Sequence, residues 1–177
     1  NPTSYEKEIE ELEFEITNGI RKLRQDTMKN VAFLQGHGEL GRYDVEDFSK
    51  ALYEYYQTGP AYLTDKEGNS KINALDGVDL LVIAKPMNKF TQKEQFILDQ
   101  FIMKGGKVLW MLEGARGAEL DSMQTQGLLF PYPLETGLDA MLFKYGVRVD
   151  KNIVEDLQCS KIPIQTTANG EGRGFKL

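Results

Sequence analysis

Residues 79–112 read DLLVIAKPMNKFTQKEQFILDQFIMKGGKVLWML, and this stretch decides the fold. Its opening run, DLLVIA, is apolar on both faces, as expected for a strand that helices cover on both sides of a parallel sheet. Thr91 and Glu94 have the spacing of a capping box, which opens a helix that the glycine pair 105–106 ends. The apolar run 108–112 predicts a second buried strand. The stretch therefore predicts a strand–helix–strand unit.

The same alternation extends toward the N-terminus. Residues 30–35, NVAFLQ, form a short β-rich run that is followed by glycine. A helix is predicted to begin near Asp44, a good N-cap residue, because apolar residues then recur at helical spacing. These residues are Val45, Phe48, Leu52 and Tyr55. A weaker strand is predicted at 61–64.

Beyond residue 112 the apolar spacing predicts a third helix and a further strand. The helix would carry Leu138, Met141, Leu142 and Tyr145 on one face, and the strand would be GVRV at 146–149. The resulting order of strands and helices favours an α/β fold with a doubly wound, mostly parallel sheet and helices on both faces. We assign this α/β domain to residues 29–177 and expect it to be truncated at its C-terminus.

An amphipathic helix precedes the domain, and residues 1–28 are interpreted as a connector. Apolar residues recur at spacings of three and four, which gives one stripe along a helix: Ile9, Leu12, Ile16, Gly19 or Ile20, and Leu23. The pattern lasts barely two heptads, too short to indicate a coiled coil. Two interpretations stay open: a helix packed on its own domain, or a connector or dimer-forming helix leading in from an upstream domain.

Composition excludes several classes of protein. The net charge of -6 leaves no basic face for phosphates, which argues against nucleic acid as a partner. A single cysteine, Cys159, excludes an internal disulfide and a cysteine-based zinc site. No apolar run approaches the roughly 20 residues that span a bilayer. Because the chain starts at Asn1-Pro2 rather than at methionine, we expect a piece of a longer protein whose membrane anchors lie elsewhere.

Polar side chains follow three of the predicted strands. In open α/β sheets, ligands bind beyond the carboxyl ends of the strands. The loops at those ends would hold the candidate ligand-binding residues: His37, Glu39, Lys85, Glu113 and Arg116. If the strands are parallel, these loops share one edge, and a polar cleft there is the expected binding site.

The loop QGHGELGRYD, residues 35–44, holds the one histidine of the chain. It matches neither glycine-rich nucleotide motif, and its carboxylates would repel phosphate at the helix N-terminus. His37 and Glu39 alone are too few ligands for a metal, so no metal and no cofactor are predicted. The simpler interpretation is a hydrogen-bonded turn histidine, with Gly36 and Gly38 in backbone conformations that other residues avoid.

No catalytic residue is predicted. A nucleophile elbow would be expected after residue 112, but the sequence there is EGARG, with alanine and arginine where a nucleophile would stand. Cys159 has no glycine elbow around it. An enzyme stays open as the alternative: an amidotransferase-like or glycan-acting hydrolase that uses His37 with Glu39 or Glu113.

Several ordered segments resemble a known family. FLQGHGE, VIAKP, FILDQ followed by GGKVLW, and LFKYGVR followed by IVEDLQC occur in this order. They resemble the extracytoplasmic part of the gliding-motility-associated ABC-transporter auxiliary proteins of Bacteroidetes, the substrate-binding-like G component of the Gld transporter. The resemblance covers roughly residues 5–165.

The resemblance implies a class I glutamine-amidotransferase-like or flavodoxin-like fold that has lost its nucleophile. It implies a position on the periplasmic side of the inner membrane, held by membrane segments outside this chain. The implied partners are an ATPase and a permease subunit, and the implied role is in gliding motility and secretion. It assigns no catalytic residue.

Overall fold

The computed structural model describes most of the chain, in the ranges 4–24, 27–65, 67–116 and 131–152, with two further strands at 164–166 and 174–176. The chain forms two compact units, residues 1–112 and residues 113–177. Each unit is described by itself below.

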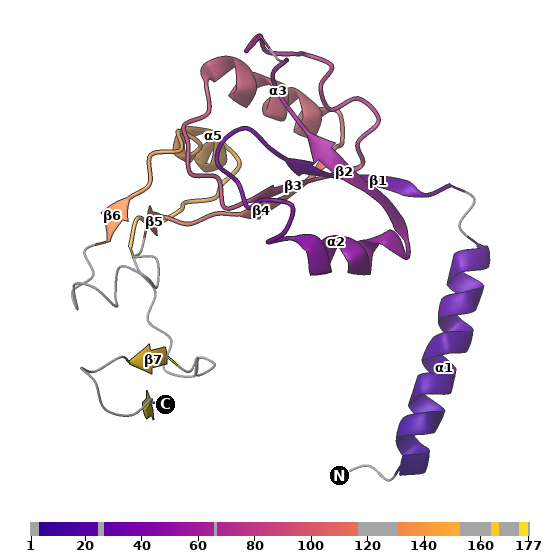
Figure 1. The fold of residues 1–177 in the computed structure, drawn as a ribbon. Coiled ribbons are helices and arrows are strands. Elements are labelled where there is room, and N and C mark those ends of the chain that lie inside the picture. The colour runs from indigo at the N-terminus through magenta and orange to yellow at the C-terminus, as the bar shows by residue number, and fades with distance from the viewer. Residues whose placement is uncertain are drawn as a thin grey trace. The chain divides into compact units, whose positions relative to one another are not determined.

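The first unit contains a four-stranded parallel sheet (Figure 1). Its strand order is β2-β1-β3-β4. The elements, in chain order, are α1 (Ser4–Leu23), β1 (Lys29–Leu34), α2 (Glu46–Tyr53), β2 (Tyr56–Ala61), β3 (Leu80–Ala84), α3 (Gln92–Met103) and β4 (Lys107–Met111). This topology confirms the predicted doubly wound α/β fold.

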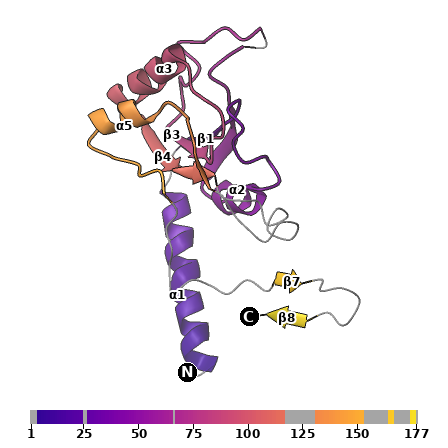
Figure 2. The same cartoon turned by 90° about the vertical axis from the view of Figure 1, so that its left-hand side faces the viewer.

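Helices cover both faces of this sheet (Figures 1 and 2). On one face, Phe33 and Val82 belong to a buried cluster against which Val45 and Leu52, from the start and the body of α2, pack. Successive residues of a strand point to opposite faces. Leu81 therefore points to the other face, where α3 lies, and it is fully buried.

The predicted strands at 30–35 and 79–84 and the capping-box helix are confirmed, but β2 is not where the sequence placed it. The strand was predicted at 61–64 and instead spans Tyr56–Ala61. Gly59 and Pro60 resemble a turn in the sequence. Because β2 is at the edge of the sheet, Pro60 can occupy it without leaving a neighbouring strand unpaired.

The start of α2 and the burial of β4 also differ from the sequence prediction. Helix α2 begins at Glu46, and Asp44 does not cap it; the Asp44 carboxylate instead accepts a hydrogen bond from the Gly41 N–H at 2.9 Å. Strand β4 was predicted to be buried, but Leu109 is 40% exposed and Met111 is 46% exposed. Exposure alternates along β4, so Leu109 and Met111 lie together on the less covered face of the strand.

The second unit consists of short elements. Strands β5 (Ala115–Arg116) and β6 (Tyr132–Pro133) pair antiparallel, as do β7 (Ile164–Thr166) and β8 (Gly174–Lys176). Helix α5 (Asp139–Lys144) is the predicted third helix, and Leu138, Met141 and Leu142 are buried as expected. Tyr145, which was predicted on the same face, follows the helix as its C-cap and is 40% exposed. The prediction of a strand at 146–149 is wrong, because residue 146 belongs to a turn and residues 147–149 have no regular secondary structure.

Helix α1 contacts its own unit through polar side chains rather than through its apolar stripe. Asn18 is 8% exposed, accepts a hydrogen bond from the Tyr55 hydroxyl at 2.6 Å and donates one to Glu54 at 3.1 Å. Lys22 forms an ion pair with Glu54 at 2.6 Å. The apolar stripe of α1 is therefore not the part that packs on this unit, and the interpretation of residues 1–28 as a connector stays a prediction. Across the described residues, no helix has both the length and the apolarity needed to cross a bilayer.

Candidate functional site

The loop between β1 and α2 is built around two glycines with left-handed backbone angles. Gly36 has φ +124° and Gly38 has φ +74°. A Cβ atom added at Gly38 would also lie 3.1 Å from Cβ of Met87 and 3.2 Å from the side-chain nitrogen Nδ2 of Asn88. The prediction that these glycines adopt conformations unfavourable for other residues is confirmed.

This close approach joins two loops at the carboxyl ends of β1 and β3. The His37 carbonyl accepts hydrogen bonds from the backbone N–H groups of Met87 and Asn88, at 2.8 and 2.7 Å. The Leu40 N–H donates to the Ala84 carbonyl at 2.9 Å. The loop that holds the histidine is thus fixed by backbone hydrogen bonds to the end of the neighbouring strand.

The imidazole of His37 lies between two carboxylates. Its Nδ1 is 3.1 Å from Glu39 and its Nε2 is 3.2 Å from Glu94. All three residues are buried, with exposed fractions of 5%, 9% and 6% in the order His37, Glu39, Glu94. The ring also stacks on Phe90, with 3.8 Å between ring centroids. We call His37, Glu39 and Glu94 the His37 clasp.

Glu94 also has a second role, because it belongs to the capping box of α3. Its Oε2 accepts hydrogen bonds from the Thr91 N–H and hydroxyl, each at 2.7 Å, while the Thr91 hydroxyl accepts from the Glu94 N–H at 3.3 Å. The other carboxylate oxygen, Oε1, contacts His37. One side chain therefore caps α3 and ties its first turn to the loop after β1.

The charges of the clasp shift all three pKa values toward the ionised forms. Burial by itself would lower the pKa of His37, but the hydrogen bond to Glu39 and the charges of Glu39 and Glu94 outweigh it, so this pKa is raised above 6.5. Burial would raise the pKa of Glu39, but hydrogen bonds to His37 and to backbone N–H groups lower it. For Glu94, burial is outweighed by the hydrogen bonds from Thr91 and the charge of His37, so its pKa is lowered.

This arrangement favours the imidazolium form of His37. Both ring nitrogens can donate hydrogen bonds only when the ring is protonated, and each faces a carboxylate oxygen. A protonated imidazole has no lone pair with which to accept a proton or bind a metal. Within the part of the chain that the structure describes, no group of three or more His, Cys, Asp or Glu side chains is arranged so that it could hold a metal ion.

Of the five predicted binding residues, the structure brings His37 and Glu39 into direct contact. Lys85 follows β3, is half-buried and has a left-handed backbone with φ 54°, which is uncommon for a residue with a side chain. Its N–H donates to the Met111 carbonyl at 2.8 Å, which continues the pairing of β3 with β4. Lys85 thus belongs to the same carboxyl edge as the clasp.

Glu113 and Arg116 belong to the second unit, and their membership of a shared site stays a prediction. Glu113 is exposed, and Arg116 pairs with Tyr132 in the antiparallel pair of β5 and β6. Ala115 is also in β5, so the position at which an elbow was sought is a short strand. Cys159 lies outside the described residues.

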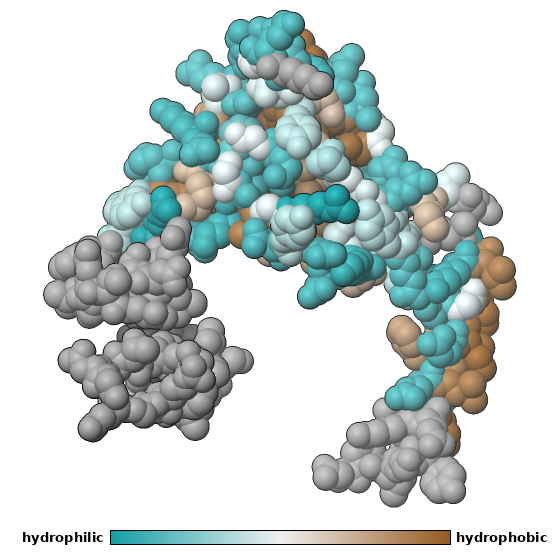
Figure 3. Space-filling view, in the orientation of Figure 1, coloured by the Kyte–Doolittle hydropathy of each residue, from teal (hydrophilic) through white to brown (hydrophobic). Residues whose placement is uncertain are grey.

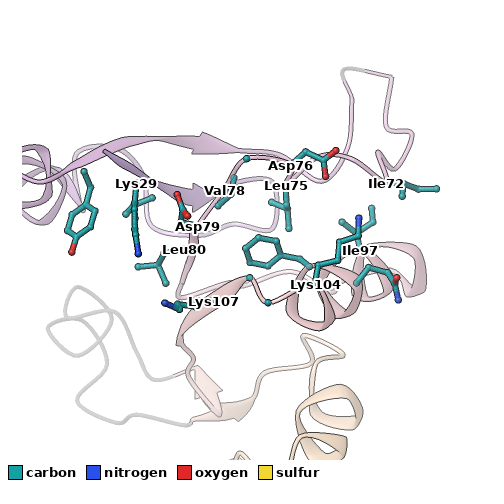
Figure 4. Close-up of a pocket in the computed structure, with 17 residues that line it drawn as sticks. Lys29, Ile72, Leu75, Asp76, Val78, Asp79, Leu80, Ile97, Lys104 and Lys107 are labelled. Carbon is teal, nitrogen blue, oxygen red and sulfur yellow. The ribbon is translucent and has the colours of Figure 1, made fainter. Parts of the chain in front are cut away.

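A cavity in the first unit is at the opposite edge of the sheet. It has a volume of about 500 Å³ and includes the first residues of β1, β3 and β4, which are Lys29, Leu80 and Lys107 (Figure 4). Apolar side chains such as Phe101 and Ile97 of α3 form its wall, with Asp76 and Lys104 also lining it. Sequence reasoning placed the cleft at the carboxyl edge and did not anticipate this cavity.

Comparison with known proteins gives one decisive match. The model of the family described as "ABC-type uncharacterized transport system" matches residues 28–175. The chain belongs to this family. It is therefore an auxiliary component of an ABC-type transport system. A comparison with curated protein sequences returned no match.

Among solved structures, this chain is similar to the mmIFT52 N-terminal domain. The two share 27% sequence identity, and the match covers 49% of this chain and 37% of that chain. Its TM-score is 0.42, so the likeness adds nothing to the description of the fold.

Sequence reasoning missed Glu94 as the partner of His37. The capping-box spacing identified Glu94 as a helix cap, and that role is confirmed. The contact with His37 depends on how the first turn of α3 approaches the loop after β1. A buried histidine needs a counter-charge, but nothing in the local sequence says which of the many glutamates supplies it.

Proposed function

We propose that this chain is a non-enzymatic, extracytoplasmic recognition domain of an ABC transporter linked to gliding motility or secretion. It binds protein partners or a small ligand, and its transporter partners are a permease and an ATPase subunit. Membership of the auxiliary family supports the transporter role. The resemblance to the Gld component supports the finer parts of the proposal, which are the compartment and the link to motility.

The observation that carries the non-enzymatic part is the state of His37. It is the single histidine of the chain, and both its ring nitrogens face buried carboxylates. A hydrolase of the kind considered above needs an imidazole that accepts a proton from a nucleophile or water. In the His37 clasp, both nitrogens of the imidazole instead contact carboxylates that hold the loop to α3. This favours recognition over catalysis.

The carboxyl edge remains the proposed recognition surface, with the clasp as its support. His37 and Glu39 are buried, so they act by fixing the loop rather than by presenting large surfaces. In the first unit the proposed contact is Lys85, with its left-handed backbone, and in the second unit the proposed contacts are Glu113 and Arg116. Uncommon backbone conformations of this kind concentrate at functional sites, which motivates the choice of Lys85.

Co-purification tests the transporter role. The full protein is expressed with the permease and ATPase subunits of its own transport system, and the tagged ATPase is purified. The proposal expects the protein to co-elute with both subunits through size exclusion. Its absence from a complex that still contains permease and ATPase would overturn the proposed partnership.

Cysteine labelling tests the compartment. Ile72 is 68% exposed, so Ile72→Cys in a Cys159→Ser background offers one accessible thiol at a known place. A membrane-impermeant maleimide added to cells with a permeable outer membrane should label it. Labelling that requires disruption of the inner membrane would place the domain in the cytoplasm and contradict the proposal.

Turnover assays test the absence of chemistry. The purified chain and its His37→Gln variant are compared on panels of glycans, esters and amides. We expect no turnover above the buffer rate from either protein. Hydrolysis by the unchanged chain that His37→Gln abolishes, with the fold intact by circular dichroism, would establish the enzymatic alternative.

A further inference from the structure

The apolar stripe of α1 is exposed along its described length. Figure 3 shows apolar residues gathered along one side of this helix. The exposed fractions are 57% for Ile9, 60% for Leu12, 56% for Ile16, 56% for Ile20 and 88% for Leu23. A continuous apolar face of this kind marks an interaction site, because single-chain proteins rarely leave one in water.

The side chains that hold α1 on its own unit lie on the opposite side of the helix. Asn18 and Lys22 contact Glu54, and the Arg21 guanidinium lies 5.1 Å from the ring centre of Tyr55. Successive residues of a helix are about 100° apart, so Asn18 is about 200° around the axis from Ile16. The polar contacts therefore orient the stripe away from the sheet.

The spacing of the stripe is symmetric about Ile16. The five residues are separated by three, four, four and three positions, so the order of spacings is the same in both directions. In an antiparallel pair of α1 helices centred on Ile16, Ile9 would lie at the level of Leu23 of the other copy. Leu12 would lie at the level of Ile20, and the two Ile16 side chains would meet at the centre.

The charges along α1 favour the same arrangement. Among the exposed charged residues that lie within about 100° of Ile16 around the helix axis, Glu13 and Glu15 are in the first part of the helix, whereas Arg24 is near its end. An antiparallel pair places each acidic segment beside the basic segment of the other copy. A parallel pair would place like charges side by side, which is unfavourable.

From the symmetric stripe and the reversed charges, we propose that α1 binds α1 of a second copy of this chain as an antiparallel helix pair. The charges also disfavour a lipid surface as the occupant, because helices that lie on membranes carry mainly lysine and arginine on their polar face. The proposal is independent of what the carboxyl edge of the sheet recognises.

Sedimentation equilibrium tests the association, with a matched pair of variants. Ile16→Asp places a charge at the centre of the stripe. Phe14→Asp places the same charge on the same helix at a residue that is 64% exposed but about 200° away from Ile16. We expect the unchanged 20.1 kDa chain to form dimers. Ile16→Asp should raise the dissociation constant at least about tenfold, which corresponds to losing the burial of one side chain. Phe14→Asp should leave the dissociation constant within about twofold of that of the unchanged chain.

Both variants replace exposed side chains, and unchanged far-ultraviolet circular dichroism confirms that α1 is still folded. A chain that stays monomeric at about 1 mM overturns the proposal, since a millimolar dissociation constant is already weak for a specific contact. Equal weakening by both variants also overturns it. Monomers that float with phosphatidylcholine vesicles would assign the stripe to lipid instead.

Disulfide trapping tests the orientation. In a Cys159→Ser background, Leu12→Cys and Ile20→Cys chains of different mass are mixed and oxidised. The antiparallel pair predicts the mixed dimer, because residues 12 and 20 lie at one level. It predicts little dimer of either chain alone, because two copies of residue 12 would be about 12 Å apart along the axis, too far for a disulfide. Dimers of each chain alone without the mixed species would show a parallel pair and overturn the proposal.

Discussion

The two edges of the sheet in the first unit differ in what fills them. At the carboxyl edge, the chain fills the space with its own charges, and the His37 clasp leaves all three side chains buried and paired. At the amino edge, a cavity of about 500 Å³ is open between α3 and the first residues of the strands. In a fold that usually binds ligands at its carboxyl edge, the chain has used part of that edge to stabilise itself.

This difference implies that substitutions at the carboxyl edge should cost far more stability than substitutions at the amino edge. The single tryptophan, Trp110, is in β4 and belongs to the first unit, so its fluorescence reports unfolding of this unit. Urea unfolding followed through the fluorescence of Trp110 therefore measures the stability of the first unit.

The largest effect is expected for His37→Ala. Removing the imidazolium leaves Glu39 and Glu94 buried without their counter-charge, and breaking a buried ion pair in this way costs about 3–5 kcal/mol. Urea unfolding at pH 6 measures the loss. Tyr43→Ala, in the same loop at a residue that is 88% exposed, is the control and should change stability by less than about 0.5 kcal/mol. Equal effects of the two variants would mean that the clasp is not a stabilising centre.

A smaller effect is expected for Gly38→Ala. The new side chain would adopt φ +74° and press on Met87 and Asn88, so we expect a loss of about 1–3 kcal/mol. Gly41→Ala is the matched control in the same loop, because its φ is not left-handed and its nearest contact, with the Asp44 carboxylate, is 3.4 Å. If both variants unfold at the same urea concentration, the close approach of the two loops is not required for stability.

The stability of the first unit should also depend on pH. The pKa of His37 is raised in the folded state, so its contribution is complete below its ordinary value of 6.5 and is lost as the pH rises through the folded value. The pKa values of Glu39 and Glu94 are lowered, so their contribution is complete above 4.5 and is lost as the pH falls through the folded values. The clasp therefore contributes most between about pH 4.5 and 6.5.

Urea midpoints between pH 5 and 9 test this dependence. Each unit by which the histidine pKa is raised corresponds to about 1.4 kcal/mol that is lost at high pH. The effect should be smaller than that of His37→Ala, because deprotonation leaves the ring packed on Phe90. The His37→Ala variant is the control and should lose the change between pH 6 and 9. A midpoint that rises over this range in the unchanged chain would contradict the account.

The smallest effect is expected at the amino edge. Ile72 lines the cavity there and is 68% exposed, so Ile72→Ala should change the free energy of unfolding by less than about 0.5 kcal/mol. A loss comparable to that of Gly38→Ala would mean that the amino edge is held together as firmly as the carboxyl edge. The comparison between the two edges would then be wrong.

The sequence predicts the fold better than it predicts the site. The buried strands and the capping box depend on local patterns, and β1, β3 and α3 are found where those patterns place them. The edge strand β2 was misplaced because Gly59 and Pro60 are turn residues in most contexts. The run GVRV has strand-like alternation, but residues 146–149 do not form a strand.

The site depends on contacts between distant parts of the chain. Sequence reasoning found the loop, the unusual glycines and the turn histidine, and each of these is confirmed. It did not find Glu94 as the second partner of His37, because this pairing is created by the packing of α3 against the loop. It also could not tell that the stripe of α1 would face away from the sheet, because a stripe predicts a helix but does not identify what covers it.

The protonation state of His37 tests the central claim most directly. Because the chain has one histidine, nitrogen-15 NMR of the imidazole reports this residue without ambiguity. We predict that the ring titrates with a pKa above 6.5 and that both ring nitrogens carry protons at pH 6. A ring that titrates at or below 6.5 would contradict the claim that His37 is held between two carboxylates as a structural cation.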